Sequence, residues 1–239
     1  MDPTLSHLVF STYLGVHVGG DALTYMPGPY LALDGAGNIY ISGQAGSRKF
    51  PTTRGAYMTT CPTPASDVEC YSLFVTKLNP TGAALIYSTF VGGPDATLSG
   101  GLAVDAAGRA IITGKLVPPG YPVTAGAVTR RCLQSKGSPQ AYECPIVTEL
   151  TPDGSALAYS TILAGPTPNT GVSLGVTTNA AGDIYVTGST GWMDFPTTKG
   201  VFQQHCPASG PGACAGPFVT VFRAPPSGAM DTARSQRRE

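Results

Sequence analysis

Apolar residues occur along this chain in short runs separated by turn residues, and the runs have the composition of β-strands. The segment LAVDAAGRAIITG, which begins at Leu102, holds two apolar runs on either side of an Asp-Ala-Ala-Gly turn. This spacing predicts an antiparallel hairpin. A second kind of segment, FVTKLNPTGAALIYSTFVGG from Phe74, joins two runs rich in Val, Thr, Ile, Tyr and Phe through Asn-Pro-Thr-Gly. These residues suit a pleated sheet and a tight turn, so the pattern predicts a second hairpin.

The same pattern occurs three times, with a period of about 72 residues. Four landmarks recur in the same order in each copy. They are FSTYLG from Phe10, YSTFVGG from Tyr87 and YSTILAG from Tyr159; LALDGAGNIYISG from Leu31, LAVDAAGRAIITG from Leu102 and VTTNAAGDIYVTG from Val176; FPTT from Phe50, YPVT from Tyr121 and FPTT from Phe195; and FVTKLNPTG from Phe74, IVTELTPDG from Ile146 and FVTVFRAPPSG from Phe218.

Each copy therefore contains two hairpins, or four strands, which is typical of a propeller blade packed by its neighbours. A parallel β-helix usually has repeats of roughly 20 residues, and a β-sandwich would show no such self-similarity. The sequence predicts an all-β fold, a β-propeller of four-stranded antiparallel blades. Three blades are expected in one domain or fragment spanning 1–239, at 28–92, 100–164 and 173–230.

The ordered strings LAVD, GNIYISG, FPTT, FVTKLNPTG and YSTFVGG resemble the bacterial β-propeller repeat called the SBBP repeat, over nearly the whole chain. The resemblance implies inner strands near Leu31, Leu102 and Leu174 and an outer strand that holds the YST motif. It also implies a large exported or cell-surface bacterial protein. The chain departs from the repeat by carrying an expanded, cysteine-bearing loop in every copy.

The two ends of the chain predict an incomplete ring, because three blades are fewer than the usual four to eight. Residues 5–15 are expected to form the outer strand of a preceding or closing blade. The outer strand of the third copy should begin at Asp231, where the chain instead reads DTARSQRRE. We expect residues 231–239 to be a disordered tail, and the codon degeneracy of Asp-Thr-Ala-Arg-Ser permits a frameshift there; a nucleic-acid-binding arm is the alternative. The ring is either part of a larger propeller or completed by another copy of the chain.

Composition and charge limit the classes of partner that we expect for this chain. Gly and Pro together make 31 + 22 = 53 residues, which agrees with many turns. The net charge is zero, with 14 basic and 14 acidic residues, so no surface is basic enough for nucleic acid and we expect none as a partner. No apolar run is long enough for a membrane-spanning helix, and the first residues do not form a signal peptide.

The six cysteines fall as one pair in each copy. Although six thiols allow 15 pairings, a pair that recurs at the same repeat position favours bonding within each copy. Zinc is the alternative, but the spacings and the single neighbouring histidine, His205, fit it poorly. Disulfides imply an oxidising compartment, so we expect an extracellular, cell-surface or periplasmic protein whose export signal lies upstream. The predicted disulfides are Cys61 with Cys70, Cys132 with Cys144, and Cys206 with Cys214.

The remaining polar motifs favour structural roles. Asp34, Asp105 and Asn179 each begin a hairpin turn, where their side chains would bond backbone amides; calcium binding is the alternative, but the spacing of a calcium loop is absent. The three histidines lie in unrelated contexts, and no nucleophile-elbow or zinc-protease motif occurs. We therefore predict no catalytic residue, no metal and no cofactor.

Aromatic residues are the remaining candidates for a structural or ligand-binding role. Phe50, Tyr121 and Phe195 stand at equivalent positions, each directly before a proline, and we expect them to anchor the long loops to the blades. Trp192 has no aromatic counterpart in the other copies, so a ligand that stacks would do so on Trp192 with Tyr57 and Phe202.

The sequence predicts a non-enzymatic binding or structural scaffold that contacts a protein or carbohydrate ligand. The alternatives are a lyase or hydrolase with its active site in further blades, and a lectin.

Overall fold

The computed structural model describes residues 7–15, 29–64, 70–94, 97–117, 120–133, 142–206 and 214–224. These residues form strands, turns and irregular segments without a helix, so the all-β prediction is confirmed. Within them no helix could cross a membrane. The strands are β1 (Tyr30–Leu33), β2 (Ile39–Gln44), β3 (Leu73–Leu78), β4 (Leu85–Val91), β5 (Thr97–Val104), β6 (Ala110–Leu116), β7 (Cys144–Leu150), β8 (Leu157–Ile162), β9 (Gly171–Thr178), β10 (Ile184–Thr190) and β11 (Gly216–Phe222).

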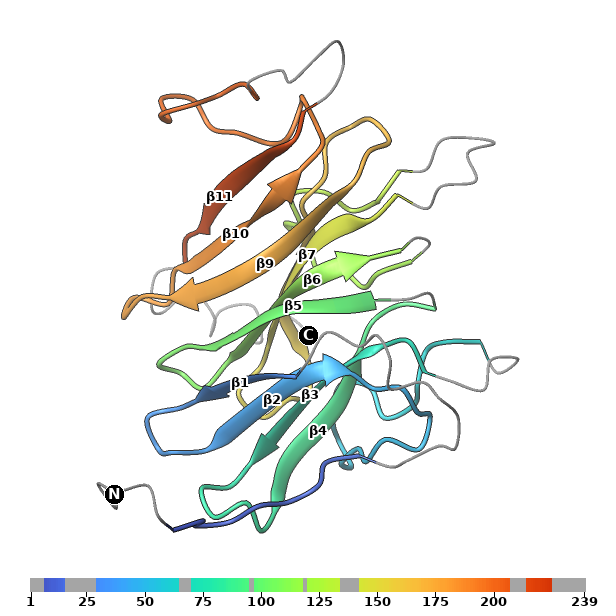
Figure 1. The fold of residues 1–239 in the computed structure, drawn as a ribbon, viewed down its shortest axis with the longest axis vertical. Coiled ribbons are helices and arrows are strands. Elements are labelled where there is room, and N and C mark those ends of the chain that lie inside the picture. The colour runs from blue at the N-terminus through green and yellow to red at the C-terminus, as the bar shows by residue number, and fades with distance from the viewer. Residues whose placement is uncertain are drawn as a thin grey trace, which may run out of the picture.

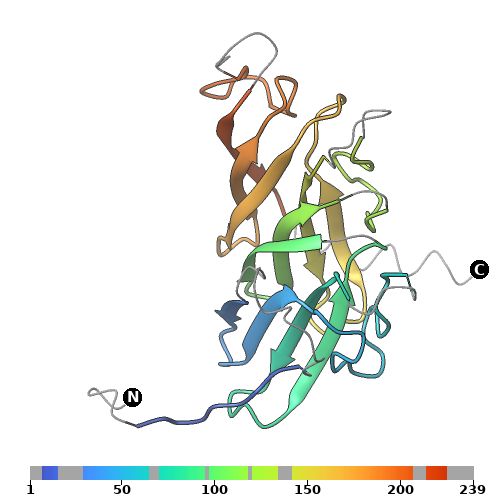
Figure 2. The ribbon, with the colours of Figure 1, turned by 45° about the vertical axis from the view of Figure 1, so that its right-hand side comes forward.

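The strands form three antiparallel sheets, one for each sequence copy. The first sheet has the order β1-β2-β3-β4, the second β5-β6-β7-β8, and the third β9-β10-β11. The sheets follow one another in chain order as an open stack (Figure 1). The first strands meet along one side, since β5 contacts β1 and β2 on one face and β9 on the other. Figure 2 shows the sheets fanning out from that side. We call the face that a sheet turns toward the next sheet its leading face, and the opposite one its trailing face.

Hydrophobic residues fill the spaces between the sheets. Val75 of the first sheet and Ile146 of the second are fully buried in one cluster, and Val147 of the second sheet and Val186 of the third are buried in the next. Neighbouring residues of one strand thus point to opposite faces, and both faces of the second sheet are covered. This explains why every residue of β7 is buried, instead of every second one.

The first hairpin of each copy closes through the same side-chain motif. The Oδ1 atom of Asp34 accepts hydrogen bonds from the backbone N–H groups of residues 36 and 38, at 3.0 and 2.9 Å. Asp105 and Asn179 accept the equivalent bonds. An amide oxygen accepts as well as a carboxylate oxygen does, which explains why Asn replaces Asp in the third copy. The predicted turn role is therefore correct.

The aromatic residue of each FPTT-type element anchors the loop to its own sheet. The ring of Phe50 lies 4.3 Å from that of Phe74, and the ring of Phe195 lies 4.6 Å from that of Phe218. Tyr121 is buried, and its hydroxyl shares a 2.8 Å hydrogen bond with Thr148. The anchoring role predicted for these three positions matches the structure.

The outer strands β4 and β8 contain the YST motif and are fixed by a repeated hydrogen bond. The hydroxyls of Thr76 and Ser88 lie 2.8 Å apart, as do those of Thr148 and Ser160. The third sheet ends at β11 within the described residues. The predicted tail at 231–239 and the proposed frameshift lie outside the residues that the structure describes.

Residues 7–15 form no strand, but they lie along the first sheet beside β4 (Figure 1). The ring of Phe10 rests on Gly82 in the β3–β4 turn. Tyr87 makes the same contact one sheet later, where its ring rests on Gly154 in the β7–β8 turn. Phe10 therefore has the same position relative to the first sheet as Tyr87 has relative to the second sheet. The assignment of 5–15 to the outer strand of a preceding or closing blade stays a prediction.

Candidate functional site

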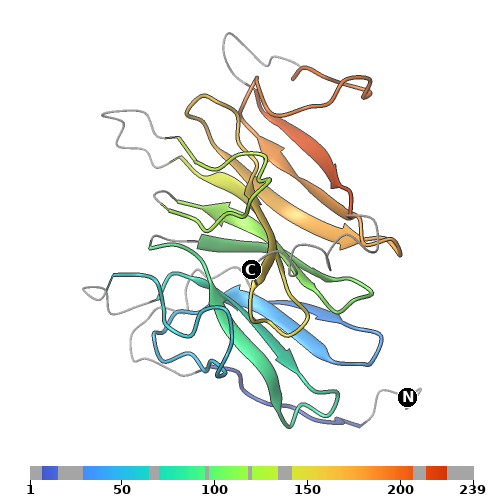
Figure 3. The ribbon, with the colours of Figure 1, turned by 180° about the vertical axis from the view of Figure 1, so that it is seen from behind.

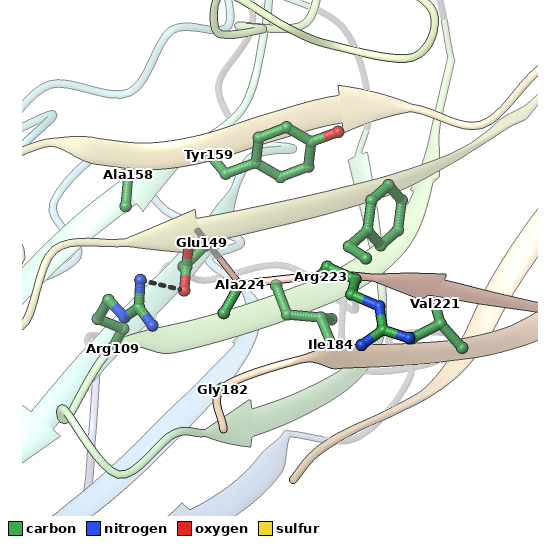
Figure 4. Close-up of a pocket in the computed structure, with 10 residues that line it drawn as sticks. Arg109, Glu149, Ala158, Tyr159, Gly182, Ile184, Val221, Arg223 and Ala224 are labelled. Carbon is green, nitrogen blue, oxygen red and sulfur yellow. Dashed lines mark ion pairs between the residues drawn. The ribbon is translucent and has the colours of Figure 1, made fainter. Parts of the chain in front are cut away.

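A cavity of about 400 Å³ lies between the second and third sheets. Figure 4 shows that its walls come from β7 and β8 on one side and from the β9–β10 turn, β10 and β11 on the other. Arg109 and Glu149 lie together at one end, and Arg223 lies beside Val221 toward the other (Figure 4). The lining residues are Arg109, Glu149, Ala158, Tyr159, Gly182, Ile184, Val221, Phe222, Arg223 and Ala224.

Arg109 is held between two carboxylates at the charged end of this cavity. Its Nε donates to Asp105 Oδ2 at 2.6 Å, and its Nη1 lies 3.2 Å from Glu149 Oε1. Burial raises the pKa of Glu149, while the attraction of Arg109 opposes that rise. Because two acidic partners already compensate the guanidinium, this end of the cavity has little attraction for an anion. The arrangement is that of a buried structural ion cluster.

The equivalent position of the first sheet carries a different ion pair. Lys77 Nζ lies 3.3 Å from Asp34 Oδ2 and 4.8 Å from the centre of the Tyr40 ring. Burial opposes ionisation of Asp34, but hydrogen bonds from Asn38 and Lys77 outweigh it and lower its pKa to about 2. The Tyr40 hydroxyl donates to the backbone oxygen of Gly108 at 3.0 Å, and so joins this cluster to the turn of the next sheet.

Gly182 has the equivalent position to Gly108 at the interface between the second and third sheets. It lies beside the Arg109 guanidinium, at a place where a Cβ would approach Nη2 to 3.2 Å. In the third sheet the cluster consists of Asn179 and Asp183, joined at 3.0 Å, and Tyr185. The clusters of the first and second sheets thus each receive the first hairpin turn of the next sheet, which makes each of them a joint between repeats.

Three disulfides tie the connection between the second and third strands of each sheet. They join the same pairs that the sequence predicts, Cys61–Cys70, Cys132–Cys144 and Cys206–Cys214, with Cα atoms 6.0, 5.8 and 5.9 Å apart. With all six sulfurs bonded to each other, the zinc alternative for these cysteines is wrong. In the described ranges, no group of three or more His, Cys, Asp or Glu side chains could hold a metal ion.

The predicted stacking residues do not form a ligand platform. Trp192 is only 1% exposed, and its indole N–H donates to the backbone oxygen of Thr167 at 2.6 Å. Its role is to fill the interior, so the ligand-stacking prediction for Trp192 is wrong. Tyr57 is half-buried against the cluster between the first and second sheets, while Phe202 is fully exposed.

The charged joints were not predicted from the sequence. Lys77, Glu149 and Val221 stand at one position of the three copies, and Asn38, Arg109 and Asp183 at another. The residues at these two positions change together from copy to copy, which could have indicated a contact.

No protein-family model matches the chain, and no curated protein matches it.

Proposed function

We propose that the chain is a non-enzymatic binding or structural scaffold: three consecutive blades of an exported or cell-surface β-propeller that contacts a protein or a glycan through its loops. The observation that carries the proposal is the repeated disulfide-tied connection on a stack of similar sheets. Rigid sheets that hold loops at a fixed spacing are a common support for binding surfaces.

The direction of the strands supports a shared binding edge. The second strands of the three sheets, β2, β6 and β10, run in the same general direction in Figure 1. The chain therefore leaves these strands at the same end of each sheet, after Gln44, Leu116 and Thr190. Loops placed in this way form one extended row that a long ligand could contact at several points.

The charged residues between the sheets support a scaffold over an enzyme. Lys77 and Glu149 are buried and Arg109 is partly buried. Each is paired with an acidic or basic neighbour, and each cluster holds the turn of the next sheet. These groups are engaged in assembly of the stack. The three disulfides support an oxidising compartment outside the cytoplasm.

A binding experiment tests the proposal. The oxidised protein is applied to an array of bacterial surface glycans and to a displayed random-peptide library. We expect enrichment of a ligand class whose binding falls when the third loop is opened by the double substitution C206S and C214S. The matched control is F222A, away from that loop. Chemical turnover of an arrayed glycan, or no enrichment from either library, would contradict the proposal.

A further inference from the structure

We propose that each of the two interfaces between consecutive sheets binds an internal water molecule. The water is held by a hydroxyl on the second strand of one sheet and by a serine on the first strand of the next sheet. The hydroxyl pairs are Ser42 with Ser99, between the first and second sheets, and Thr113 with Ser173, between the second and third. The inference concerns how the stack is held together, and it goes beyond the binding role proposed above.

The four hydroxyl groups are buried and have no hydrogen-bond partner in the described part of the chain. All four residues are 6% exposed or less. Transfer of a hydroxyl out of bulk water without a new partner is unfavourable, so buried polar groups in native proteins are paired with protein atoms or with ordered water. Thr113 is the counterpart of Ser42, and Ser173 is the counterpart of Ser99. The unpaired hydroxyls are therefore a repeated feature of the sheet interfaces.

The alternation of side chains places the first pair in one interface. Ser42 is two residues from Tyr40 on β2, and Tyr40 is buried in the cluster that the first two sheets share, so Ser42 lies on the leading face. Ser99 pairs with Gly114 of β6, which is two residues from Ile112 of the same cluster. Opposite residues of paired strands lie on one face of a sheet, so Ser99 faces back toward the first sheet.

The second pair is placed in the same way. Thr113 is two residues from Ile111 on β6. Ser173 pairs with Gly188, which is two residues from Val186 on β10. Ile111 and Val186 are both buried in the cluster between the second and third sheets. Thr113 and Ser173 therefore point into this interface from opposite sides.

A β-bulge in the inner strand brings a third polar group to the second pair. The register of β9 shifts so that Leu174 has no partner residue in β10, and Gly100 is the equivalent bulged residue of β5. Thr113 Oγ1 and the backbone oxygen of Leu174 lie 2.9 and 3.2 Å from the point where a Cβ atom of residue 101 would stand. The hydroxyl and the bulge carbonyl thus approach the same glycine of β5. By repeat equivalence, we expect the carbonyl of Gly100 to serve the first pair.

The inner strands are close together at this point, which shields the site from solvent. β9 lies beside β5 when the stack is viewed from either side (Figures 1 and 3). A Cβ atom at residue 100 would clash with the backbone oxygen of Ser173. Glycine therefore permits a contact between the two backbones, and the neighbouring hydroxyls are enclosed with them.

Water is the occupant that these groups fit. A water molecule donates and accepts hydrogen bonds, so it satisfies a hydroxyl pair whichever member donates. Internal waters make about three hydrogen bonds, which two hydroxyls and one carbonyl supply. All three groups are neutral, and no cluster of possible metal ligands occurs among the described residues.

Thr187 shows a competing way to satisfy a hydroxyl at this position. It is the counterpart of Thr113 in the third sheet, and it donates to the backbone oxygen of Phe218 at 2.9 Å. Thr113 makes no such bond to the equivalent residue, Ile146. Rotation of Thr113 toward Ile146 would need no water, and the following measurements distinguish the two arrangements.

Magnetic relaxation dispersion of water nuclei counts long-lived internal waters in solution. We expect the double substitution T113V and S173A to release one of the internal waters of the wild-type chain. T76V is the matched control, because Thr76 is also fully buried but shares a 2.8 Å hydrogen bond with Ser88. T76V should leave the count unchanged. High-resolution diffraction from the wild-type protein should show a water within hydrogen-bond distance of Thr113 and Ser173.

The sign of the stability change gives a second test. Valine has nearly the shape of threonine, so T113V removes the hydroxyl and leaves the packing intact. If the hydroxyl binds water, T113V loses a hydrogen bond and should lower the unfolding temperature by about 2–4 °C. If the hydroxyl is unpaired, T113V removes an unfavourable buried polar group and should raise that temperature. T113S keeps the hydroxyl and should keep the water.

Three results would overturn the inference. They are an unchanged water count in the double variant, a higher unfolding temperature for T113V, and a direct bond from Thr113 to Ile146 or Ser173 in the diffraction map. The binding role is tested separately, because the array experiment concerns the loops. A protein without an enriched ligand would keep these waters, and a protein without these waters would still bind through its loops.

Discussion

The second and third sheets have similar strands but different surroundings. Val147 in β7 and Val219 in β11 follow an aliphatic or aromatic residue and precede a threonine, yet the first is fully buried and the second is 76% exposed. The second sheet has a neighbour on both faces, and the third has one only on its trailing face within the described residues. A single repeat therefore cannot bury its own apolar residues, because a neighbouring sheet supplies the other wall of the core. Four experiments test whether a neighbouring sheet accounts for the difference between the second and third sheets.

The largest effect is expected where the third sheet is buried. Trp192 fills the interior on the side of the second sheet and packs closely on Gly171. W192A should lower the free energy of unfolding by about 3–5 kcal/mol, since it removes a large buried side chain and a hydrogen bond. F202A is the matched control, because Phe202 is fully exposed, and it should change stability by less than about 0.5 kcal/mol. Urea unfolding of both variants gives the two values; equal values would show that exposure does not separate the two sites.

Release of the disulfide of the second copy should have the next largest effect. The double substitution C132A and C144A opens a loop with a sequence separation of 12, and the chain-entropy model gives a loss of about 3 kcal/mol. Thermal unfolding measures the loss, and mass spectrometry after alkylation verifies that Cys61–Cys70 and Cys206–Cys214 stay intact. An unchanged unfolding temperature would show that the loop does not depend on its cross-link.

The most direct test of the comparison is the pair V147A and V219A. V147A leaves a cavity between two sheets and should cost about 2 kcal/mol. V219A removes exposed atoms and should cost less than about 0.5 kcal/mol. Denaturant unfolding of both variants measures the two costs. Equal costs would contradict the difference in burial between Val147 and Val219.

The smallest effect concerns the charged joint of the first sheet. D34N places there the amide that the third copy has naturally at Asn179, so the turn is kept and the ion pair with Lys77 is lost. The pKa of Asp34 is lowered from 3.8 to about 2 in the folded chain, so its charge stabilises the fold above about pH 4, and this contribution disappears as the pH falls toward 2. D34N should cost about 1 kcal/mol or less at pH 7 and nothing near pH 2. Unfolding measured at both pH values checks this; a cost that is the same at both would rule out the ion pair as its cause.

Much of the architecture could be predicted from the sequence because the signals are local and repeated. Asp34, Asp105 and Asn179 mark the same turn, and Phe50, Tyr121 and Phe195 the same anchor, and each motif needs only residues nearby in its own copy. The charged joints could not be predicted in this way. The Arg109 cluster joins a turn to β7 and then receives a turn of the next sheet, and such contacts depend on how the sheets stack.

The burial of Trp192 is a second feature that could not be predicted from the sequence. Its lack of a counterpart in the other copies indicated that it was unusual, but the sequence could not distinguish an exposed aromatic surface from a buried interior position. The structure places its ring beneath Thr167 and beside Gly171, where the absence of a glycine side chain makes room for it.

The sequence by itself determined the period, the two hairpins of each repeat, the turn motif and the cysteine pairs, because each of these follows from the order of residues within one copy. Tertiary contacts determine which of these equivalent residues are buried, which charges form joints, and that Leu31 of the first sheet and Val219 of the third are exposed among the described residues. Burial and electrostatic pairing depend on which sheet lies opposite, and identical local sequences carry no information about that neighbour.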